Sequence, residues 1–196
     1  MKSKYILAKL VIVLGFTIIT TSFMAGISYA FDPADLQKLK TTGGCPKCDL
    51  SGVNLPSEKL IRAQLPGSKL SDANLSNANL DHAHLPGVNL SNANLSNANL
   101  PAANLHEANL TNANLASAYM VGANLANANL TGANLSGADL NQAALIGANL
   151  SNANLMETYL TNSNLDNAIL TGANLSGASW IDGTMCKPGS IGECKK

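Results

Sequence analysis

The chain has little charge and few aromatic rings, and basic residues are missing from its largest part. Charged residues make up 12% of the 196 residues and aromatic residues 4%, and no Lys or Arg lies between Ser71 and Trp180. Binding to nucleic acid needs a patch of Lys and Arg that neutralises phosphates, so this composition excludes nucleic acid as a partner. No Gly-rich phosphate-binding loop precedes a predicted helix either, so the sequence lacks one common motif of phosphate-binding enzymes.

The part without basic residues is dominated by a strict repeat. From Leu50 to Trp180 an apolar residue recurs at every fifth position, and 25 of these 27 positions are Leu. A period of five fits neither the 3.6 residues of a helical turn nor the two residues of a strand. A chain that turns a corner every five residues would point all of these residues inward. Two residues earlier, 20 of the 27 positions are Ala, so a large and a small residue would share a narrow, dry core.

The remaining positions of the repeat predict a turn. Two residues after each Leu, most repeats carry Gly, Asn or Asp, and all nine Gly between Leu50 and Trp180 occupy this position. These residue types tolerate left-handed backbone angles. Asn also fills 16 of the 27 positions immediately before the apolar residue.

Units such as SNANL, TGANL and SGADL resemble the pentapeptide-repeat family, whose pattern centres on A-(D/N)-L followed by small and turn residues. The resemblance covers roughly residues 46–180 and recurs 27 times without insertion. It implies an all-β solenoid, namely a right-handed quadrilateral β-helix with four pentapeptides per coil and about seven coils. At ~4.8 Å per stacked strand, the rod would be roughly 32 Å long. A filled rod has no cleft, so we expect no enzymatic activity and no cofactor.

Residues 20 apart should stack on successive coils, and two neighbouring columns of this kind are uniform. We expect them to form a ladder face on one side of the rod, and stacked Asn amides can bond between coils. The hydroxylated column consists of Ser51, Ser71, Ser91, Thr111, Thr131, Ser151 and Thr171. The Asn column consists of Asn54, Asn74, Asn94, Asn114, Asn134, Asn154 and Asn174.

Residues 1–30 predict a secretory signal peptide. Three Lys precede an apolar stretch over residues 10–24, and residues 28–30 offer small side chains at a cleavage site. An uncleaved membrane anchor is the alternative. The mature chain would have no membrane segment and would be exported to the periplasm, to a thylakoid lumen if the source is cyanobacterial, or out of the cell.

The rest of the mature chain divides into three parts. Residues 31–44 predict a short capping helix that begins with Asp32 and Pro33 and is stopped by two Gly. Residues 45–180 hold the repeat, and residues 181–196 form a C-terminal cap. Because both ends would be covered, we expect a monomer, with end-to-end association as the alternative.

All four Cys lie at the ends of the predicted rod, Cys45 and Cys48 at one end and Cys186 and Cys194 at the other. Two of the three possible pairings would cross the rod, roughly 30 Å, whereas a disulfide needs Cα atoms within ~7 Å. We therefore expect two local disulfides that keep the terminal coils of an exported protein from fraying. A redox C-x-x-C is the alternative, although no thioredoxin-like pattern surrounds it. The segment CPKCDLSG also resembles the junction after the helix in secreted members of the family.

Three His are the only candidates for a metal site. His82, His84 and His106 would lie on the surface within about one coil of each other, with Glu107 beside the last. A uniform surface offers few groups that could orient metal ligands. We therefore expect solvated surface His and no metal.

One column carries the candidate binding site. Tyr119, Asp139 and Tyr159 stack where Asn is the norm, with Met120 in the core beneath Tyr119. Exposed Tyr is favoured at recognition sites. The alternative is that the family tolerates occasional bulky residues at this position.

Three functions follow in order of preference. The first is an exported, non-catalytic binding or scaffold module for an unknown protein or cell-envelope partner. The second is a binder of ice or polysaccharide through the ladder face. The third comes from the resemblance: some pentapeptide-repeat proteins mimic B-form DNA and protect DNA gyrase. The six acidic residues between Ser71 and Trp180 are too sparse for that mimicry, and export would separate the protein from gyrase.

Overall fold

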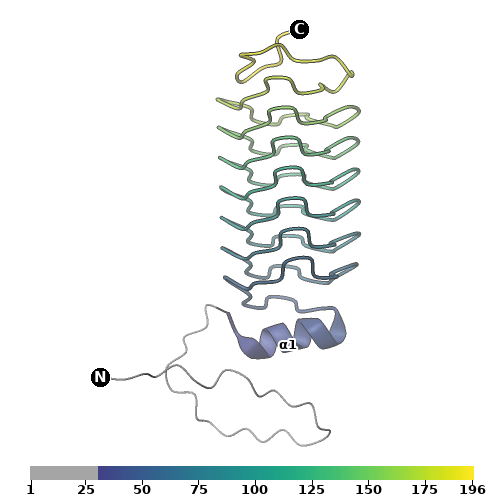
Figure 1. Cartoon of the computed structure of the whole chain (residues 1–196), viewed down its shortest axis with the longest axis vertical. Helices are drawn as coiled ribbons and strands as arrows, with labels where there is room; N and C mark the ends of the chain where they lie inside the picture. The colour runs from purple at the N-terminus through teal and green to yellow at the C-terminus, as the bar shows by residue number, and fades with distance from the viewer. Residues whose placement is uncertain (1–30) are drawn as a thin grey trace, which may run out of the picture.

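A computed structural model describes residues 31–196, in which a helix leads into a four-sided rod (Figure 1). Helix α1 (Pro33–Thr42) is the only helix in this part of the chain. The Asp32 carboxylate accepts the Ala34 N–H at 2.8 Å as an N-cap, and Gly43 ends the helix with φ 70°. No helix of the described part is long and apolar enough to cross a membrane. The predicted signal peptide lies outside the described residues.

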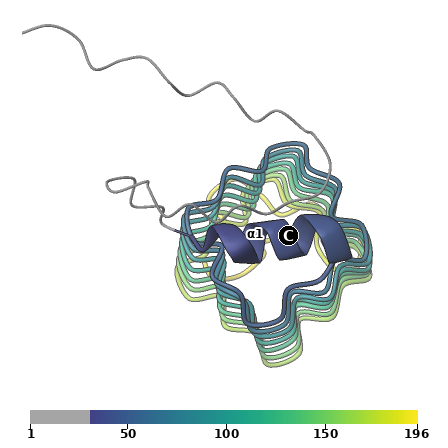
Figure 2. The ribbon, with the colours of Figure 1, turned by 90° about the horizontal axis from the view of Figure 1, so that it is seen from below.

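The rod rises by one coil every 20 residues. Each residue that precedes the core Leu forms a parallel bridge with the residue 20 positions later, from Gly44–Gln64 to Tyr159–Ser179. Backbone hydrogen bonds join the coils in the same register; the N–H of Leu110, for example, donates to the carbonyl of Asn129 at 2.7 Å. Viewed along the axis, the coils superimpose as a square outline with turns at its corners (Figure 2).

The core follows directly from the repeat. Every Leu from Leu65 to Leu160, together with Met120, is at most 2% exposed, and the residue two positions before each is equally buried; it is Ala except at Ser68, Val88 and Thr158. The large residue of one coil therefore packs on the large residues of the coils above and below, and Ala leaves the room for it. The stacked Leu side chains fill the interior of these coils, so the groups available to a partner are those on the surface and at the ends of the rod.

The corner position two residues after Leu has positive φ throughout the repeat, whether or not it is Gly. Glu107 and Gln142, for example, have φ of 58° and 60°. Gly avoids a close approach at some corners: a Cβ on Gly132, whose φ is 67°, would lie 2.5 Å from the Oδ1 of Asn112 in the previous coil, so that the Asn112 side chain would have to move. Strict periodicity therefore imposes a left-handed angle that most of these residues adopt at some cost.

We number the four sides of the rod by the columns of outward-facing residues at their centres. Face 1 carries Gly44, Gln64, His84, Asn104, Asn124, Ala144 and Asn164. Face 2 carries Asp49, Lys69, Asn89, Asn109, Asn129, Asn149 and Ile169. Face 3 carries the predicted Asn column, Asn54 to Asn174. Face 4 carries Lys59, Asn79, Asn99, Tyr119, Asp139, Tyr159 and Ser179.

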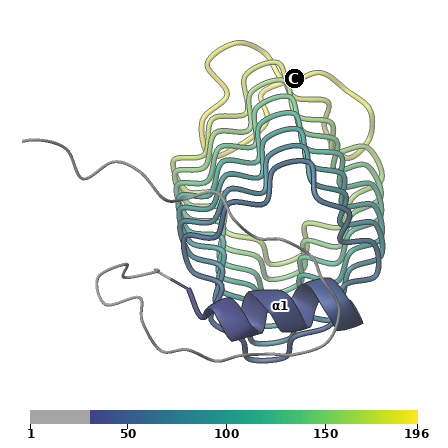
Figure 3. The same cartoon turned by 60° about the horizontal axis from the view of Figure 1, so that its bottom comes forward.

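Helix α1 lies across the N-terminal end of the rod (Figure 3). Between α1 and the first coil is a cavity of about 240 Å³, lined by Leu39, Leu55 and Leu60 among others. Glu58, which occupies a small-residue position of the repeat, is half-buried at this cavity. The first coil thus departs from the regular packing because a charged residue stands where Ala is usual.

The C-terminal segment covers only part of the opposite end. Residues 181–196 turn back over the rod and pair antiparallel with its last coil, through the bridges Ser179–Met185 on face 4 and Asn174–Ile191 on face 3. No residue of the described chain pairs in this way above faces 1 and 2. The bridges of this segment thus lie over faces 3 and 4, and Gly192 lies at the corner between faces 2 and 3, where a Cβ on it would be 3.6 Å from the Leu170 carbonyl oxygen.

Two disulfides fasten the ends. Cys45 is bonded to Cys48 with Cα atoms 5.5 Å apart, and Cys186 is bonded to Cys194 with Cα atoms 5.0 Å apart. Cys45, Cys48 and Cys186 are buried against the ends of the Leu core. Each bridge therefore replaces part of the apolar cover that a further coil would provide.

Candidate binding face

Face 4 is the one side of the rod with an aromatic column. Tyr119 and Tyr159 lie two coils apart, about 10 Å along the axis, with Asp139 between them. Their exposed fractions are 46% and 52%, although each backbone is held in the ladder on both sides. Two large rings thus stand on a rigid backbone in contact with solvent, an arrangement that costs little side-chain entropy on binding.

Apolar side chains extend this column to the C-terminal end. Ser179 continues the column above Tyr159, and its antiparallel partner Met185 in the cap is 61% exposed. Met156 and Ile181 occupy the corners on either side of face 4 and are also exposed. Sequence reasoning missed Met156, Ile181 and Met185, because only the return of the cap and the corner geometry place them along face 4.

The electrostatics of face 4 are weakly acidic. Asp139 accepts the backbone N–H of Asn141 at 3.0 Å, and its carboxylate has no ion-pair partner among residues 31–196. At the corner above, Asp182 is paired with Lys196, whose hydrogen bond lowers the pKa of Asp182 far below its usual range. Asp139 is therefore the free carboxylate that lies between the two rings.

The predicted ladder face is also present, but its polar groups are bonded to each other. On face 3, the Nδ2 of Asn74, Asn114, Asn134 and Asn154 donates to the Oδ1 of the Asn one coil below at 2.7, 3.3, 3.2 and 3.0 Å. Each Oδ1 of this series also accepts a backbone N–H two residues later, as in Ala116 to Asn114 at 3.2 Å. The Asn column therefore stabilises the stack and leaves few free groups for a ligand.

The hydroxylated column lies at the corner between faces 2 and 3, and its hydroxyl groups form hydrogen bonds with residues of face 2 and not with the Asn column of face 3. The hydroxyls of Thr111, Thr131 and Ser151 donate to the Asn two residues earlier on face 2 at 2.7, 2.7 and 2.6 Å. These donors are therefore engaged within the rod. This side of the rod therefore does not present the regular lattice of free hydroxyls that binding to ice or polysaccharide would need.

Replacing Asn114 with Ala should lower the free energy of unfolding by about 1–2 kcal/mol, because it breaks two interstrand amide bonds and leaves the Ala116 N–H without its acceptor. Asn54→Ala at the first coil serves as control, since it removes a single bond from Asn74. Urea unfolding followed by circular dichroism measures both. Equal stability of Asn114→Ala and the parent would show that the ladder does not hold the coils together.

The three His do not converge. His82 Nδ1 lies 2.6 Å from an Asp81 carboxylate oxygen, His84 Nδ1 lies 3.4 Å from the Asn104 Nδ2, and His106 pairs with Glu107 at 3.3 Å. None of them belongs to a group of three potential metal ligands in the described part of the chain.

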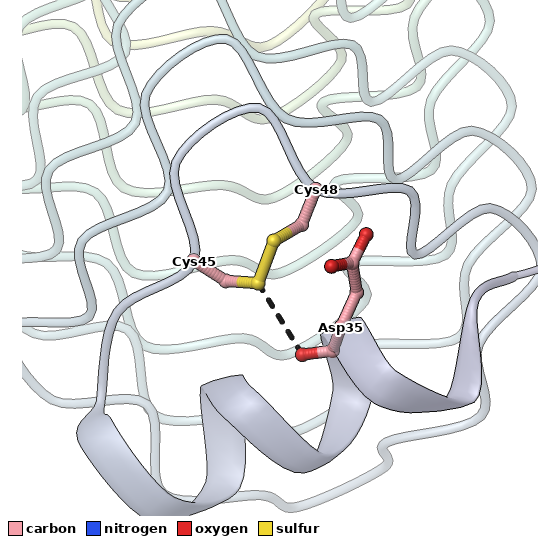
Figure 4. A group of neighbouring side chains, drawn as sticks. All are labelled: Asp35, Cys45 and Cys48. Carbon is pink, nitrogen blue, oxygen red and sulfur yellow. Dashed lines mark hydrogen bonds between the residues drawn. A yellow bond between two sulfur atoms is a disulfide. The ribbon is translucent and has the colours of Figure 1, made fainter.

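The one close group of potential ligands lies under α1 and consists of Asp35, Cys45 and Cys48 (Figure 4). Both sulfurs are joined in the disulfide, so they are not available as thiolates. The Asp35 carboxylate instead accepts the Asp49 N–H at 2.8 Å. This group ties α1 to the first coil and has a structural role.

The repeat of this chain is similar to the repeats of known proteins. The family model described as pentapeptide repeats (8 copies) matches residues 48–87, 73–112, 108–145 and 138–177. Among solved structures, the pentapeptide repeat protein Rfr23 from the cyanobacterium Cyanothece 51142 is 32% identical, with 69% of this chain and 96% of that chain covered and a TM-score of 0.52. The search of curated proteins returns no match.

Two further solved structures are more distant. QnrB1, a plasmid-mediated fluoroquinolone resistance protein, is 23% identical over 69% of this chain and 68% of that chain, with a TM-score of 0.40. HetL, a pentapeptide repeat protein involved in heterocyst differentiation regulation from the cyanobacterium Nostoc sp. strain PCC 7120, is 23% identical over 78% and 98%, with a TM-score of 0.25. Neither carries an argument about this chain at these scores. The family match and the likeness to Rfr23 agree with a right-handed quadrilateral β-helix.

Proposed function

We propose, since this chain belongs to the pentapeptide-repeat family, that it is a non-catalytic binding module whose binding surface is face 4. In this proposal the protein is exported and presents a rigid rod to a protein partner in the periplasm, in a thylakoid lumen or outside the cell. The single observation that carries it is the solvent-exposed column of Tyr119, Asp139 and Tyr159, which continues into Met185.

The contrast with the other faces supports face 4. Face 3 consists of Asn whose amides bond to each other, and single Asn–Asn bonds of the same kind lie on face 1, on face 2 and on the N-terminal part of face 4, below Tyr119. A surface whose polar groups are already paired gains little from a polar partner. On face 4, rings and Met side chains are exposed without such pairing, and their burial would contribute about 25 cal/mol per Å² of apolar surface.

The chemistry of face 4 also indicates the kind of partner. A free carboxylate between two Tyr rings suits a Lys or Arg side chain, which can pair with Asp139 while its cationic end lies over a ring. The rod itself offers no competing cation here, because no Lys or Arg lies between residues 70 and 186. We therefore infer a protein segment with a basic residue flanked by apolar ones.

Removing both rings, as Tyr119→Ala with Tyr159→Ala, should abolish capture of the partner while the fold stays intact, because both side chains point away from the core. The test is crosslinking in the native host followed by purification of the tagged protein. The matched control is Asn109→Ala with Asn149→Ala, which alters face 2 at the same two-coil spacing. Asp139→Asn should weaken capture at low salt in particular. A partner that is retained by the Tyr variant, or lost equally in the face 2 variant, would refute face 4 as the site.

The other two functions find less support. The bonded hydroxyls and amides described above argue against ice or polysaccharide binding by the ladder face. Mimicry of DNA for gyrase would need a dense row of carboxylates, whereas the exposed columns of faces 1 to 4 are mainly Asn. No observation in the described part of the chain favours either.

A further inference from the structure

The cavity between α1 and the first coil has an apolar floor and room for a small molecule. α1 crosses the square outline of the rod without covering all of it (Figure 2), and the cavity of about 240 Å³ lies beside its C-terminal half. Leu39, Leu55 and Leu60 line this cavity and are at most 7% exposed. A cavity of about 150 Å³ already binds benzene, so this one can hold an organic molecule with a few more atoms.

The Glu58 carboxylate lines this cavity without a partner. Its position in the repeat points inward and holds Ala in most repeats, so the longer side chain enters the space beside α1. Glu58 is half-buried, and its carboxylate forms no hydrogen bond or ion pair with any residue from 31 to 196. A carboxylate that has lost part of its hydration favours a cationic donor, because a charge-assisted hydrogen bond replaces the lost water.

The backbone of Lys59 offers two more polar groups at the same cavity. One coil above, Asn79 donates its N–H to the Glu58 carbonyl at 2.9 Å, and its own carbonyl accepts from the Leu60 N–H at 2.7 Å. The N–H and the carbonyl of Lys59 have no such partners among the described residues, because α1 takes the place of the strand that would lie below. A bound molecule can therefore form hydrogen bonds here without displacing any bond of the rod.

Two ammonium groups lie at the mouth of the cavity. Lys40 of α1 and Lys59 of the first coil both line it and are exposed, and neither forms an ion pair with Glu58 or with any other residue that the structure describes. Ile61, which is 50% exposed, adds apolar surface at the same mouth. The cavity thus offers one negative group inside, two positive groups outside and apolar walls between them.

We propose that this cavity binds a free α-amino acid with an apolar side chain of about the size of leucine. The ammonium group of the ligand pairs with Glu58, and its carboxylate pairs with Lys40 and Lys59 at the mouth. Its side chain packs on Leu55 and Leu60. A molecule with only one of the two charges leaves the carboxylate or the two ammonium groups of the site unpaired, and a polar side chain would lose its hydration against the Leu floor.

This site is separate from the binding surface proposed on face 4. The ladder that contains Lys59 reaches Tyr119 only through Asn79 and Asn99, so three coils separate the cavity from the first ring. The two proposals can therefore fail independently.

Leucine and two analogues with the same branched carbon chain test the proposal. Isoamylamine lacks the carboxylate, and isocaproate lacks the ammonium group. Calorimetric titration of the intact protein, purified from its host and dialysed, should give a dissociation constant for leucine of about 0.1 mM. Amide NMR should show that the shifted signals belong to Glu58, Lys59 and Ile61. Each analogue should bind at least tenfold more weakly than leucine, because it loses a charge-assisted contact.

Variants of the two charged parts of the site should act on different ligands. Glu58→Gln keeps the shape of the side chain and should weaken leucine and isoamylamine at least tenfold, whereas isocaproate binds as before. Lys40→Gln with Lys59→Gln should weaken leucine and isocaproate, whereas isoamylamine binds as before. Glu107→Gln, at an exposed corner of the rod, is the matched control and should leave all three ligands unchanged.

Three results would overturn the proposal. The first is the absence of any shifted amide signal with millimolar leucine, methionine or phenylalanine. The second is equal binding of leucine to the parent protein and to Glu58→Gln. The third is loss of leucine binding in Tyr119→Ala with Tyr159→Ala, because that result would place the ligand on face 4.

Discussion

Replacing Leu115 with Ala is expected to lower the free energy of unfolding by about 3–5 kcal/mol. Leu115 lies in the middle of the rod, is fully buried, and contacts the core from the coils on both sides. The backbone around it is fixed by hydrogen bonds to both neighbouring coils, as in Leu115 to Asn134 at 2.7 Å. The walls therefore cannot collapse into the cavity, which places the cost at the upper end of the usual range.

The matched control is Leu165→Ala at the open end. Leu165 is partly exposed and has no coil above it, so we expect a loss of about 1 kcal/mol. Urea unfolding measures both variants. In a stack of coils each repeat contacts only its neighbours, so the Leu115 variant should also unfold less cooperatively. Equal losses at the two sites would contradict the continuous, dry core described here.

Breaking the Cys186–Cys194 disulfide, by Cys186→Ser with Cys194→Ser, should release the cap from the rod. The bridge closes a loop with a sequence separation of 8, which corresponds to about 2.5 kcal/mol of loop entropy. Without it, the cap is held by a few backbone bonds and by the pair of Lys196 with Asp182. Hydrogen exchange should then accelerate at Leu175, Gly177 and Trp180, whose acceptors belong to the cap.

The corresponding change at the other end, Cys45→Ser with Cys48→Ser, is the comparison. That bridge has a sequence separation of 3 and a loop entropy of about 1.6 kcal/mol, and α1 still covers it. We expect the first coil to stay protected, since Asp35 continues to hold the Asp49 N–H. Unchanged exchange at Gly177 and Trp180 in the C-terminal variant would show that the cap needs no covalent fastening.

The repeat made most of the rod predictable. A Leu at every fifth position places all Leu inside a chain that turns at each repeat, so the core from Leu65 to Leu160 follows from the spacing. The columns of residues 20 apart follow from the four-sided coil that the resemblance to pentapeptide-repeat proteins implies. Tyr119 and Tyr159 were assigned to one column on the same basis, and the structure places both there with Asp139 between them.

What the repeat did not predict lies where the repeat stops. Met185 lies beside Ser179 because the chain reverses after Trp180, and no periodic signal gives the direction of a return. For the same reason the sequence does not predict that the antiparallel bridges of the cap lie on faces 3 and 4. The partners of Thr111 and Ser151 were also missed, since hydroxyls on a corner can bond to either adjacent face and side-chain geometry decides between them.

The central claim, that face 4 binds a protein, is tested most directly by a photo-crosslinking amino acid placed at single positions in the native host. The replaced residues are Tyr119 and Tyr159 on face 4, and Asn109 and Asn114 on faces 2 and 3 as controls of equal height. The account predicts that the same protein is captured from Tyr119 and Tyr159 and is not captured from Asn109 or Asn114. Capture from all four positions, or from none, would contradict it.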